Sequence, residues 1–273
     1  MTFRMAILAA AMTLLATTAN AVEAQSFGGR DMLVYVPQHP APEGQRALVV
    51  VLHGALGNAG RIADEKSETA MNLDEAAEKN GFVVAYLNGT GVMRFFQSKM
   101  LGWNAGACCG LPAKNNVDDV AYIRDAVRDL ERRYGIARGD AFVIGHSNGA
   151  MMALRMMCET QVFAAAVSIS GALEAMDQTC PDARGKRILA IHGVNDDNVP
   201  VAGGVGKGLS DVNYKPEAYA AKVFRNSGAD YDLRIVPGAD HFLKNIDAAL
   251  VKTEGVSVSQ KAVRFFGLNK PAL

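Results

Sequence analysis

The sequence predicts an α/β domain with a mostly parallel central sheet and helices on both of its faces. Short apolar runs recur along the 273 residues. Most of these runs are continuous rather than alternating, as in strands that are buried on both sides. Helical patterns with one apolar face separate the runs. Because strands alternate with helices, we expect right-handed crossovers and parallel strands, with no large cap domain.

Seven strands are expected, in chain order, at residues 32–36, 47–53, 82–87, 141–145, 164–170, 187–193 and 231–236. The first of them can run antiparallel at an edge of the sheet. The clearest helix is the sequence VDDVAYIRDAVRDLERRYG, for which Asn116 is the expected N-cap and Gly135 the expected end. Further helices are expected near residues 64–79 and at residues 148–158, 216–227 and 257–266.

The N-terminal residues 1–21 have the layout of a secretory signal peptide. A positive charge comes first, an uncharged apolar run follows, and an A-x-A pattern ends the segment. We expect cleavage after Ala21, with Ala24 as the alternative, and a protein secreted to an extracellular or periplasmic location. The apolar run is short for a membrane anchor. Residues 22–273 are then expected to form a single catalytic domain.

The charge pattern argues against several classes of partner. The chain has 28 basic and 28 acidic residues, so its formal net charge is zero. Lys and Arg form no cluster, and nucleic acid and anionic membrane surfaces are therefore not expected as partners. A neutral or mixed small-molecule or polymer substrate fits this composition better. The sequence does not specify an oligomeric state.

The sequence GHSNG at residues 145–149 fits the pattern G-x-S-x-G, which raises the question of whether Ser147 is a nucleophile. An expected strand ends directly before Ser147, and an expected helix begins directly after it. A serine on such a turn projects its hydroxyl above the carboxyl edge of the sheet, and the helix N-terminus favours an oxyanion there. This setting favours a catalytic serine over an ordinary turn residue.

A serine hydroxyl needs a base, which an acid must orient. Of the five histidines, only His241 follows the candidate acids, as the order Ser…Asp…His requires. Asp196 and Asp197 both lie just past an expected strand end. The residues alone do not decide which of the two is the acid, because this stretch is also rich in turn-forming residues.

An oxyanion hole needs two backbone N–H groups. Asn148, directly after the candidate nucleophile, can supply one of them. The second is expected from the loop after the strand at 47–53, where Ala55 is the first choice and Leu56 the next. No Lys-Ser/Thr pair follows this glycine-rich loop, so the sequence gives only weak support for a phosphate-binding role.

The sequence resembles the α/β-hydrolase esterases of the polyhydroxybutyrate-depolymerase-like family, which are related to feruloyl and acetylxylan esterases. The matching stretches are LHG (52–54), GWNAGACCG (102–110), NNVDDVAYIR (115–124), GHSNGA (145–150) and IHGVNDDNVPVAGG (191–204). The resemblance implies an α/β-hydrolase fold and selects Asp196, in H-G-x-x-D, as the acid. It also places the histidine of the site in a G-x-x-H stretch that matches His241.

The segment 88–116 is expected to lie over the carboxyl edge of the sheet, as part of a substrate cleft. It contains Phe95, Phe96 and Trp103, which could form an apolar shelf for an acyl or aryl group. Packing of Trp103 against the body of the domain is the alternative. His146 is a further candidate substrate contact, although its side chain is expected to point away from Ser147.

The four cysteines of an exported chain are expected to form disulfides rather than a metal site. Cys158 ends the helix after Ser147, at the far end of the sheet from Cys108 and Cys109. Bridged Cα atoms lie within about 7 Å of each other, so we predict the pair Cys158–Cys180. The two adjacent cysteines remain either a vicinal pair or two thiols.

Together these residues predict a secreted serine esterase. Ser147, His241 and Asp196 are the expected catalytic residues, with water resolving the acyl-enzyme and with no metal or organic cofactor. The expected partner is an ester-bearing small molecule, oligomer or polymer, and we expect soluble esters rather than solid polymer. Amide cleavage, as by a peptidase or a poly(aspartic acid) hydrolase, and a non-catalytic binding protein on this scaffold are the alternatives.

Overall fold

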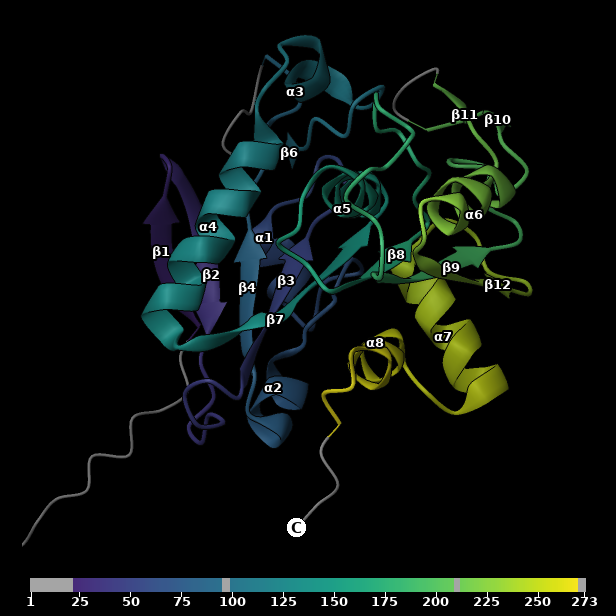
Figure 1. Ribbon diagram of the computed structural model, residues 1–273. Helices are drawn as coiled ribbons and strands as arrows, with labels where there is room; N and C mark the ends of the chain where they lie inside the picture. Colours follow the sequence, from purple (N-terminus) through teal and green to yellow (C-terminus); the bar gives the residue numbers. More distant parts are fainter. Residues whose placement is uncertain (1–21, 95–98, 209–211, 270–273) are drawn as a thin grey trace, which may run out of the picture.

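The computed structural model describes residues 22–94, 99–208 and 212–269. The signal peptide predicted at residues 1–21 lies outside these described residues. Across them runs one eight-stranded sheet with the order β1-β2-β4-β3-β7-β8-β9-β12 (Figure 1). Its strands are β1 (Glu23–Phe27), β2 (Arg30–Tyr35), β3 (Arg46–Leu52), β4 (Val83–Leu87), β7 (Ile136–His146), β8 (Ala165–Ile169), β9 (Arg187–Gly193) and β12 (Asp230–Val236).

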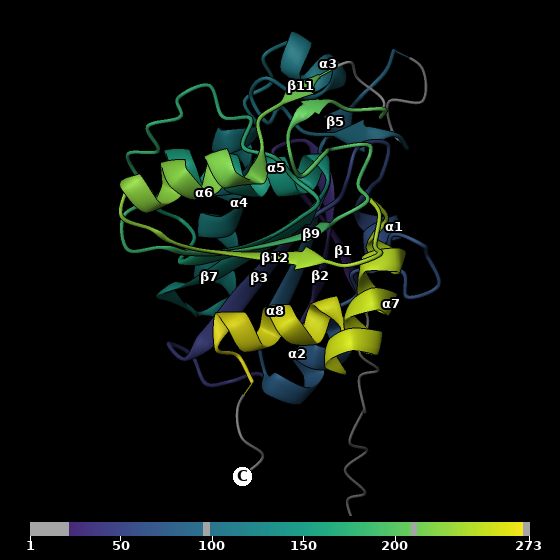
Figure 2. The same ribbon diagram turned by 90° about the vertical axis from the view of Figure 1, so that its right-hand side faces the viewer.

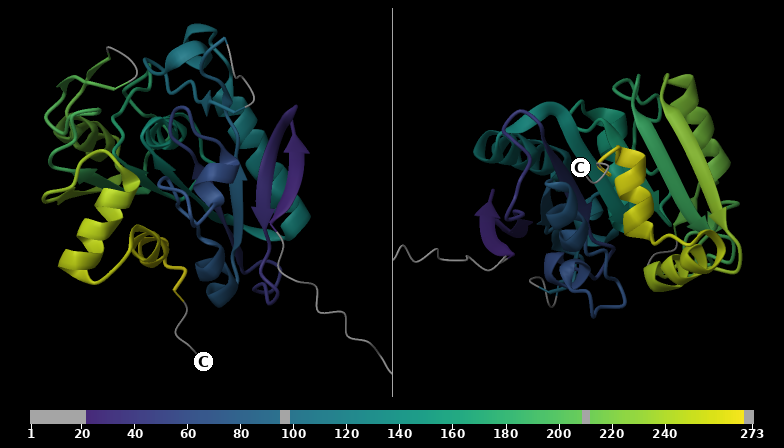
Figure 3. Two further views of the ribbon diagram at one scale, coloured as in Figure 1. Left: turned by 180° about the vertical axis from the view of Figure 1, so that it is seen from behind. Right: turned by 90° about the horizontal axis from the view of Figure 1, so that it is seen from below.

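The seven predicted strands are all present, and the sheet is parallel from β4 through β3, β7, β8 and β9 to β12. The first predicted strand, β2, pairs antiparallel with β4. It does not form the edge, because β1 forms a hairpin with it and lies outside it. Figure 3 shows this hairpin at one edge of the sheet and the C-terminal strands at the opposite edge.

The helices lie on both faces of the sheet, as predicted (Figure 2). They are α1 (Ala59–Ala63), α2 (Asp74–Asn80), α3 (Gly110–Lys114), α4 (Asp119–Tyr134), α5 (Asn148–Glu159), α6 (Glu217–Asn226), α7 (Leu243–Glu254) and α8 (Val258–Phe266). Helices α4, α5 and α6 pack on one face, and α1, α2, α7 and α8 pack on the other. No helix in the described part of the chain is long and apolar enough to cross a membrane.

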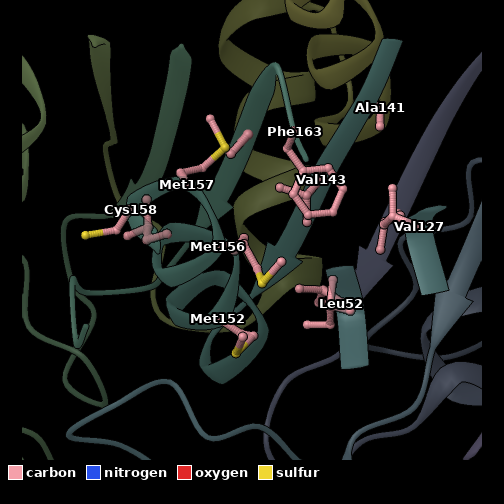
Figure 4. Packing of buried hydrophobic residues seen from close by; sticks show 14 of the residues in the cluster. Leu52, Val127, Ala141, Val143, Met152, Met156, Met157, Cys158 and Phe163 are labelled. Atoms are coloured by element: carbon pink, nitrogen blue, oxygen red, sulfur yellow. The ribbon is translucent and has the colours of Figure 1, made fainter. Parts of the chain in front are cut away.

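The two-sided burial of the sheet explains why its strands are continuous apolar runs. In β3, Leu48 and Val50 face the first group of helices, whereas Val49 and Val51 face the second. Successive side chains of a strand point to opposite faces, so a strand covered on both sides needs apolar residues at every position. Figure 4 shows how methionines of α5 fill the space above β7.

The predicted extent of the helix near residues 64–79 is wrong. Helix α1 ends at Ala63, and α2 begins only at Asp74. Between them the carboxylate of Asp64 accepts a hydrogen bond from the N–H of Lys66, and the side chain of Asn72 accepts one from the N–H of Asp74. Such local side-chain bonds compete with the helical backbone pattern.

The N-cap predicted for α4 is also wrong. Asp118 caps this helix, because its side chain accepts a hydrogen bond from the N–H of Ala121. Asn116 lies outside the helix with a positive φ of 50°. Gly135 ends the helix in the left-handed conformation, as predicted.

Both disulfide positions are bonded. Cys158 at the end of α5 is linked to Cys180 on the connection to β9, as predicted. Cys108 and Cys109 are linked to each other, which decides between the two alternatives left by the sequence. The vicinal pair lies directly before α3, in the segment that contributes to the carboxyl edge of the sheet.

A buried carboxylate holds this segment to the body of the domain. Asp119, the first residue of α4, forms an ion pair with Arg30 of β2 and accepts a hydrogen bond from the backbone N–H of Asn104 at 2.6 Å. Burial raises the pKa of Asp119, and the nearby Arg30 guanidinium opposes that rise. The adjacent acidic pair of NNVDD therefore has two different structural roles, one as a helix cap and one as a loop anchor.

We predict that Asp119→Ala lowers the free energy of unfolding by about 3 kcal/mol, because it leaves a largely buried arginine and a backbone N–H unpaired. Urea denaturation measures this loss. Asp125→Ala is the matched control, since Asp125 lies on the same helix in an exposed ion pair with Arg124. It should unfold close to the wild type. Equal effects of the two substitutions would contradict the anchoring role.

Candidate active site

Ser147 occupies a strained turn between β7 and α5. Strand β7 ends at His146 and α5 begins at Asn148, so Ser147 alone makes the connection. Its φ of 55° and ψ of −122° are rare for a residue with a side chain. The N–H of Ser147 donates to the carbonyl of Ile169 in the neighbouring strand β8. The turn is therefore tied to the sheet, and the side chain is left free to point away from it.

The two glycines of the motif are required by close backbone contacts. A Cβ on Gly145 would collide with the carbonyl of Gly149, and a Cβ on Gly149 would collide with the carbonyls of Leu52 and His53. Strand β7, helix α5 and the end of β3 thus approach each other too closely for any side chain. This contact fixes Ser147 above the carboxyl ends of the central strands.

Three side chains from three strand ends meet at this point. The Nε2 atom of His241 lies 2.9 Å from Oγ of Ser147. Its Nδ1 atom lies 2.8 Å from Oδ2 of Asp196. Asp196 follows β9 and His241 follows β12, so the parallel sheet brings together residues that are far apart in the chain. The arrangement links a hydroxyl, an imidazole and a carboxylate in series.

Asp196 is held by hydrogen bonds to both of its oxygens. Oδ1 accepts from the backbone N–H groups of Asn198 and Val199, and Oδ2 faces both His241 and His192. Burial alone would raise the pKa of Asp196, but the hydrogen bonds from the two histidines lower it below its usual range. The carboxylate therefore stays ionised, and its two oxygens are oriented by the loop and by the imidazoles.

A cavity of about 530 Å³ opens over Ser147. Its apolar wall consists of Leu56, Ile62, Val92, Met151 and Phe242. Ala55 and Asn148 also line it, and the backbone N–H of neither has an acceptor among the described residues. Two unpaired N–H groups beside Ser147 are suited to hold a negatively charged oxygen. Both predicted donors thus line the cavity.

His146 lines the cavity but is engaged with the protein. Its Nε2 atom donates to the carbonyl of His241 at 2.8 Å, because a carbonyl can only accept. Burial lowers the pKa of His146 to about 4. A neutral imidazole fixed in this way supports the His241 loop. The structure places it at the cavity wall.

Trp103 does not form the predicted substrate shelf. Its side chain is fully buried and does not line the cavity. The indole N–H donates to the carbonyl of His53, and the backbone of Trp103 makes two hydrogen bonds with the amide side chain of Asn148. Trp103 thus packs beneath the site, which is the alternative that the sequence left open. Phe95 and Phe96 lie outside the described residues.

Two features of the site were missed in the sequence. Cys109 of the vicinal disulfide lines the cavity, although only a structural role was considered for the cysteine pair. His192 contacts the carboxylate of Asp196 and also Glu217, at the start of α6. The spacing H-G-x-x-D gave a signal for the first contact, since a turn after a strand brings those residues together. No pattern connects Glu217 with either residue, because 25 positions separate it from His192.

The sheet, its crossovers and the turn at Ser147 define an α/β-hydrolase fold. The family of phospholipases and carboxylesterases matches residues 39–245. The chain belongs to this family.

The chain is also similar to a curated relative and to solved structures. The curated "Putative esterase NocK" of Nocardia uniformis subsp. tsuyamanensis is 32% identical over 172 residues, which cover 61% of this chain and 45% of that protein. The chain thus spans less than half of that relative. The carboxylesterase of Bacillus cereus has a TM-score of 0.60 at 16% identity, over 88% of this chain and 94% of that one. LpqC, a poly(3-hydroxybutyrate) depolymerase from Bordetella parapertussis, has a TM-score of 0.56 at 16% identity, over 88% of each chain. These two structures share the fold.

A buried acid lies on a segment whose backbone is hydrogen-bonded to the residue before the vicinal disulfide. The backbone carbonyl of Glu174, which follows β8, accepts a hydrogen bond from the N–H of Ala107 at 2.9 Å. The side chain of Glu174 is buried, and burial raises its pKa from 4.5 to about 7, although Lys215 opposes the rise. Between these two values the folded carboxyl keeps its proton, whereas the unfolded one has lost it. The free energy of unfolding therefore falls as the pH rises through this window.

We predict that Glu174→Gln removes this pH dependence. The change that it causes in the free energy of unfolding should be more stabilising at pH 8 than at pH 4 by about 3 kcal/mol. Denaturant midpoints of the wild type and the variant, compared at both pH values, measure the difference. Glu65→Gln, a change at an exposed carboxylate, is the control and should alter the two midpoints equally. A difference between wild type and Glu174→Gln that does not change with pH would contradict the assignment.

Proposed function

We propose that the protein is a serine esterase that cleaves carboxylic esters through Ser147, His241 and Asp196. The observation that carries this proposal is the continuous hydrogen-bonded series from Oγ of Ser147 through the imidazole of His241 to the carboxylate of Asp196. The membership in an esterase family supports the same reaction. The series has the order and geometry that a serine needs to become a nucleophile at neutral pH.

In the proposed reaction, Oγ of Ser147 attacks the ester carbonyl carbon while Nε2 of His241 takes the hydroxyl proton. The N–H groups of Asn148 and Ala55 stabilise the oxyanion that forms. The tetrahedral intermediate collapses, and His241 returns the proton to the departing alcohol. Water then attacks the acyl-enzyme with His241 as the base, which releases the acid and restores Ser147. Asp196 keeps His241 in the tautomer whose Nε2 can accept a proton.

The proposed substrates are soluble carboxylic esters, such as hydroxyalkanoate oligomers and feruloyl or acetyl esters. The cavity of about 530 Å³ suits a small acyl group, and its wall is largely apolar. Phe242, which is 57% exposed directly after His241, extends this apolar surface to the rim. The likeness to a poly(3-hydroxybutyrate) depolymerase makes hydroxybutyrate oligomers a natural choice among these esters.

We also propose that the enzyme is exported and that residues 1–21 are removed. The charge and apolar pattern of the N-terminal residues supports this. The Cys158–Cys180 disulfide also supports it, since such bonds persist in oxidising compartments. Mass spectrometry of the mature N-terminus tests the proposal, with Val22 as the expected first residue.

A hydrolysis panel tests the proposed reaction. Short p-nitrophenyl esters, feruloyl esters, hydroxybutyrate oligomers and poly(aspartic acid) should be compared at equal enzyme concentration. We expect turnover of the esters and little of the amide polymer. Ser147→Ala and His241→Ala should each lower kcat by at least ~10³-fold, and the double variant should lose little more, because the two residues act as one unit.

Ser259→Ala on α8, on the face of the sheet that α1, α2 and α7 share, is the matched control and should retain activity. Faster turnover of poly(aspartic acid) than of every ester would favour the amide-cleaving alternative. A folded wild type with no turnover in the whole panel would favour a binding protein. Activity that survives in Ser147→Ala would contradict the proposed nucleophile.

A further inference from the structure

A second imidazole lies behind the acid of the site. His192, in strand β9, is 1% exposed and lies between two carboxylates. Its Nε2 atom is 3.1 Å from Oδ2 of Asp196, and its Nδ1 atom is 2.8 Å from Oε1 of Glu217. The hydroxyl of Tyr231, in β12, donates to the other oxygen of Glu217 at 2.7 Å. The series that begins at Ser147 therefore continues past Asp196 into the core.

The carbonyl of Val199 fixes the proton on one side of His192. This carbonyl lies 2.8 Å from Nε2, and since it can only accept, Nε2 carries a hydrogen. That hydrogen is shared with Oδ2 of Asp196, which also faces Nδ1 of His241. One carboxylate oxygen is therefore contacted by two imidazoles. On the other side, a proton lies between Nδ1 of His192 and Glu217.

The charges around His192 favour an imidazolium. Burial alone would lower the pKa of His192, but the hydrogen bonds to Asp196 and Glu217 and the charges of both carboxylates raise it to about 9. The other titratable groups nearby are His241 beyond Asp196 and Tyr231 beyond Glu217. The pKa of Tyr231 is raised well above its usual value by burial and by the Glu217 charge, so this phenol stays neutral. His146 lies farther away, behind His241, and burial keeps it neutral.

We propose that His192 and Glu217 form a positioning pair that orients Asp196 toward His241 and sets the pH range in which His241 works as a base. The proposal rests on the proposed function of the Ser147 site. His192 does not touch the substrate and acts through Asp196. Its Nε2–H fixes the carboxylate oxygen that His241 uses, and Glu217 on α6 holds the ring in place. Neither residue was assigned a role on sequence grounds.

The positive charge of His192 has a consequence for His241. An imidazolium next to Asp196 offsets part of the carboxylate charge that faces the imidazole of His241. Removal of that positive charge makes the surroundings of His241 more negative, and an imidazole that carries a proton on both nitrogens cannot act as the base. The acid limb of the pH profile of kcat/KM should then move to higher pH. A purely structural anchor between α6 and β9 would not move this limb.

Glu217→Gln tests the proposal, because it keeps the size of the side chain and removes one of the two carboxylate charges that raise the pKa of His192. The imidazolium lies closer to His241 than the Glu217 carboxylate does, so its loss dominates. We expect the acid limb of kcat/KM to move up by about one pH unit. We also expect the plateau kcat to fall about tenfold, well short of the ~10⁴-fold loss that follows neutralisation of a triad acid. Hydrolysis of p-nitrophenyl acetate, followed at the isosbestic wavelength of the product, measures both quantities.

A second variant and a control complete the test. His192→Gln/Glu217→Gln leaves no unpaired buried charge and should move the limb in the same direction, which covers the case that the single variant does not fold. Tyr86→Phe is the control, since it removes a buried hydrogen bond to Asp74 in the other half of the core. It should lower the melting temperature without moving the limb.

The possible outcomes separate this proposal from the proposed function. Wild-type turnover that Ser147→Ala abolishes supports the esterase mechanism by itself. Given that result, an acid limb and a plateau kcat in folded Glu217→Gln equal to those of the wild type would overturn the positioning role, even if the melting temperature falls. A limb that moves to lower pH would overturn it as well. Absence of wild-type turnover would instead overturn the proposed function.

Discussion

Strand β7 and helix α5 approach the end of β3 so closely that only glycine fits at residues 145 and 149. The rest of the site depends on this contact, because it forces the chain to reverse within the single residue Ser147. The core around α5 absorbs the resulting backbone strain, since every turn of that helix is packed with buried side chains. The backbone of Trp103 holds the N-terminus of α5 through two hydrogen bonds with the side chain of Asn148, the first residue of that helix. The position of the hydroxyl is therefore a property of the packed core, and the loops contribute its partners.

Electrostatics provide the second constraint. Both oxygens of the Asp196 carboxylate accept hydrogen bonds, and one of the donors is the buried imidazole of His192, whose other nitrogen faces Glu217 on α6. The cost of burying these charges is offset only because each group is hydrogen-bonded to the next. Such a series couples the chemistry at Ser147 to the packing of α6 and β12. It also makes the site sensitive to neutralisation of a single distant residue, because Asp196, His192 and Glu217 are all buried.

Local patterns in the sequence carried much of the fold. Continuous apolar runs identified seven of the eight strands of the central sheet, and the turn at residues 145–149 could be located because a strand and a helix flank it. Strand β1, with exposed and half-buried residues, lacks such a run, and α7 begins two residues after the candidate base without a side-chain cap. Local polar contacts shortened the helix expected at 64–79. Site partners that follow from their order in the chain could be predicted. The positions of Trp103 and Glu217 could not, because they depend on tertiary packing. An indole buried beneath a loop and an indole exposed in a cleft have the same sequence signature.

The central claim is that the turn at Ser147 presents an activated nucleophile. Reaction of the folded enzyme with a fluorophosphonate probe, followed by peptide mapping, tests it most directly. The account predicts one equivalent of adduct on Ser147, none in Ser147→Ala, and strongly slowed labelling in His241→Ala, because the hydroxyl then has no base. A folded wild type that takes up no probe, or one that carries the adduct on another residue, would contradict it.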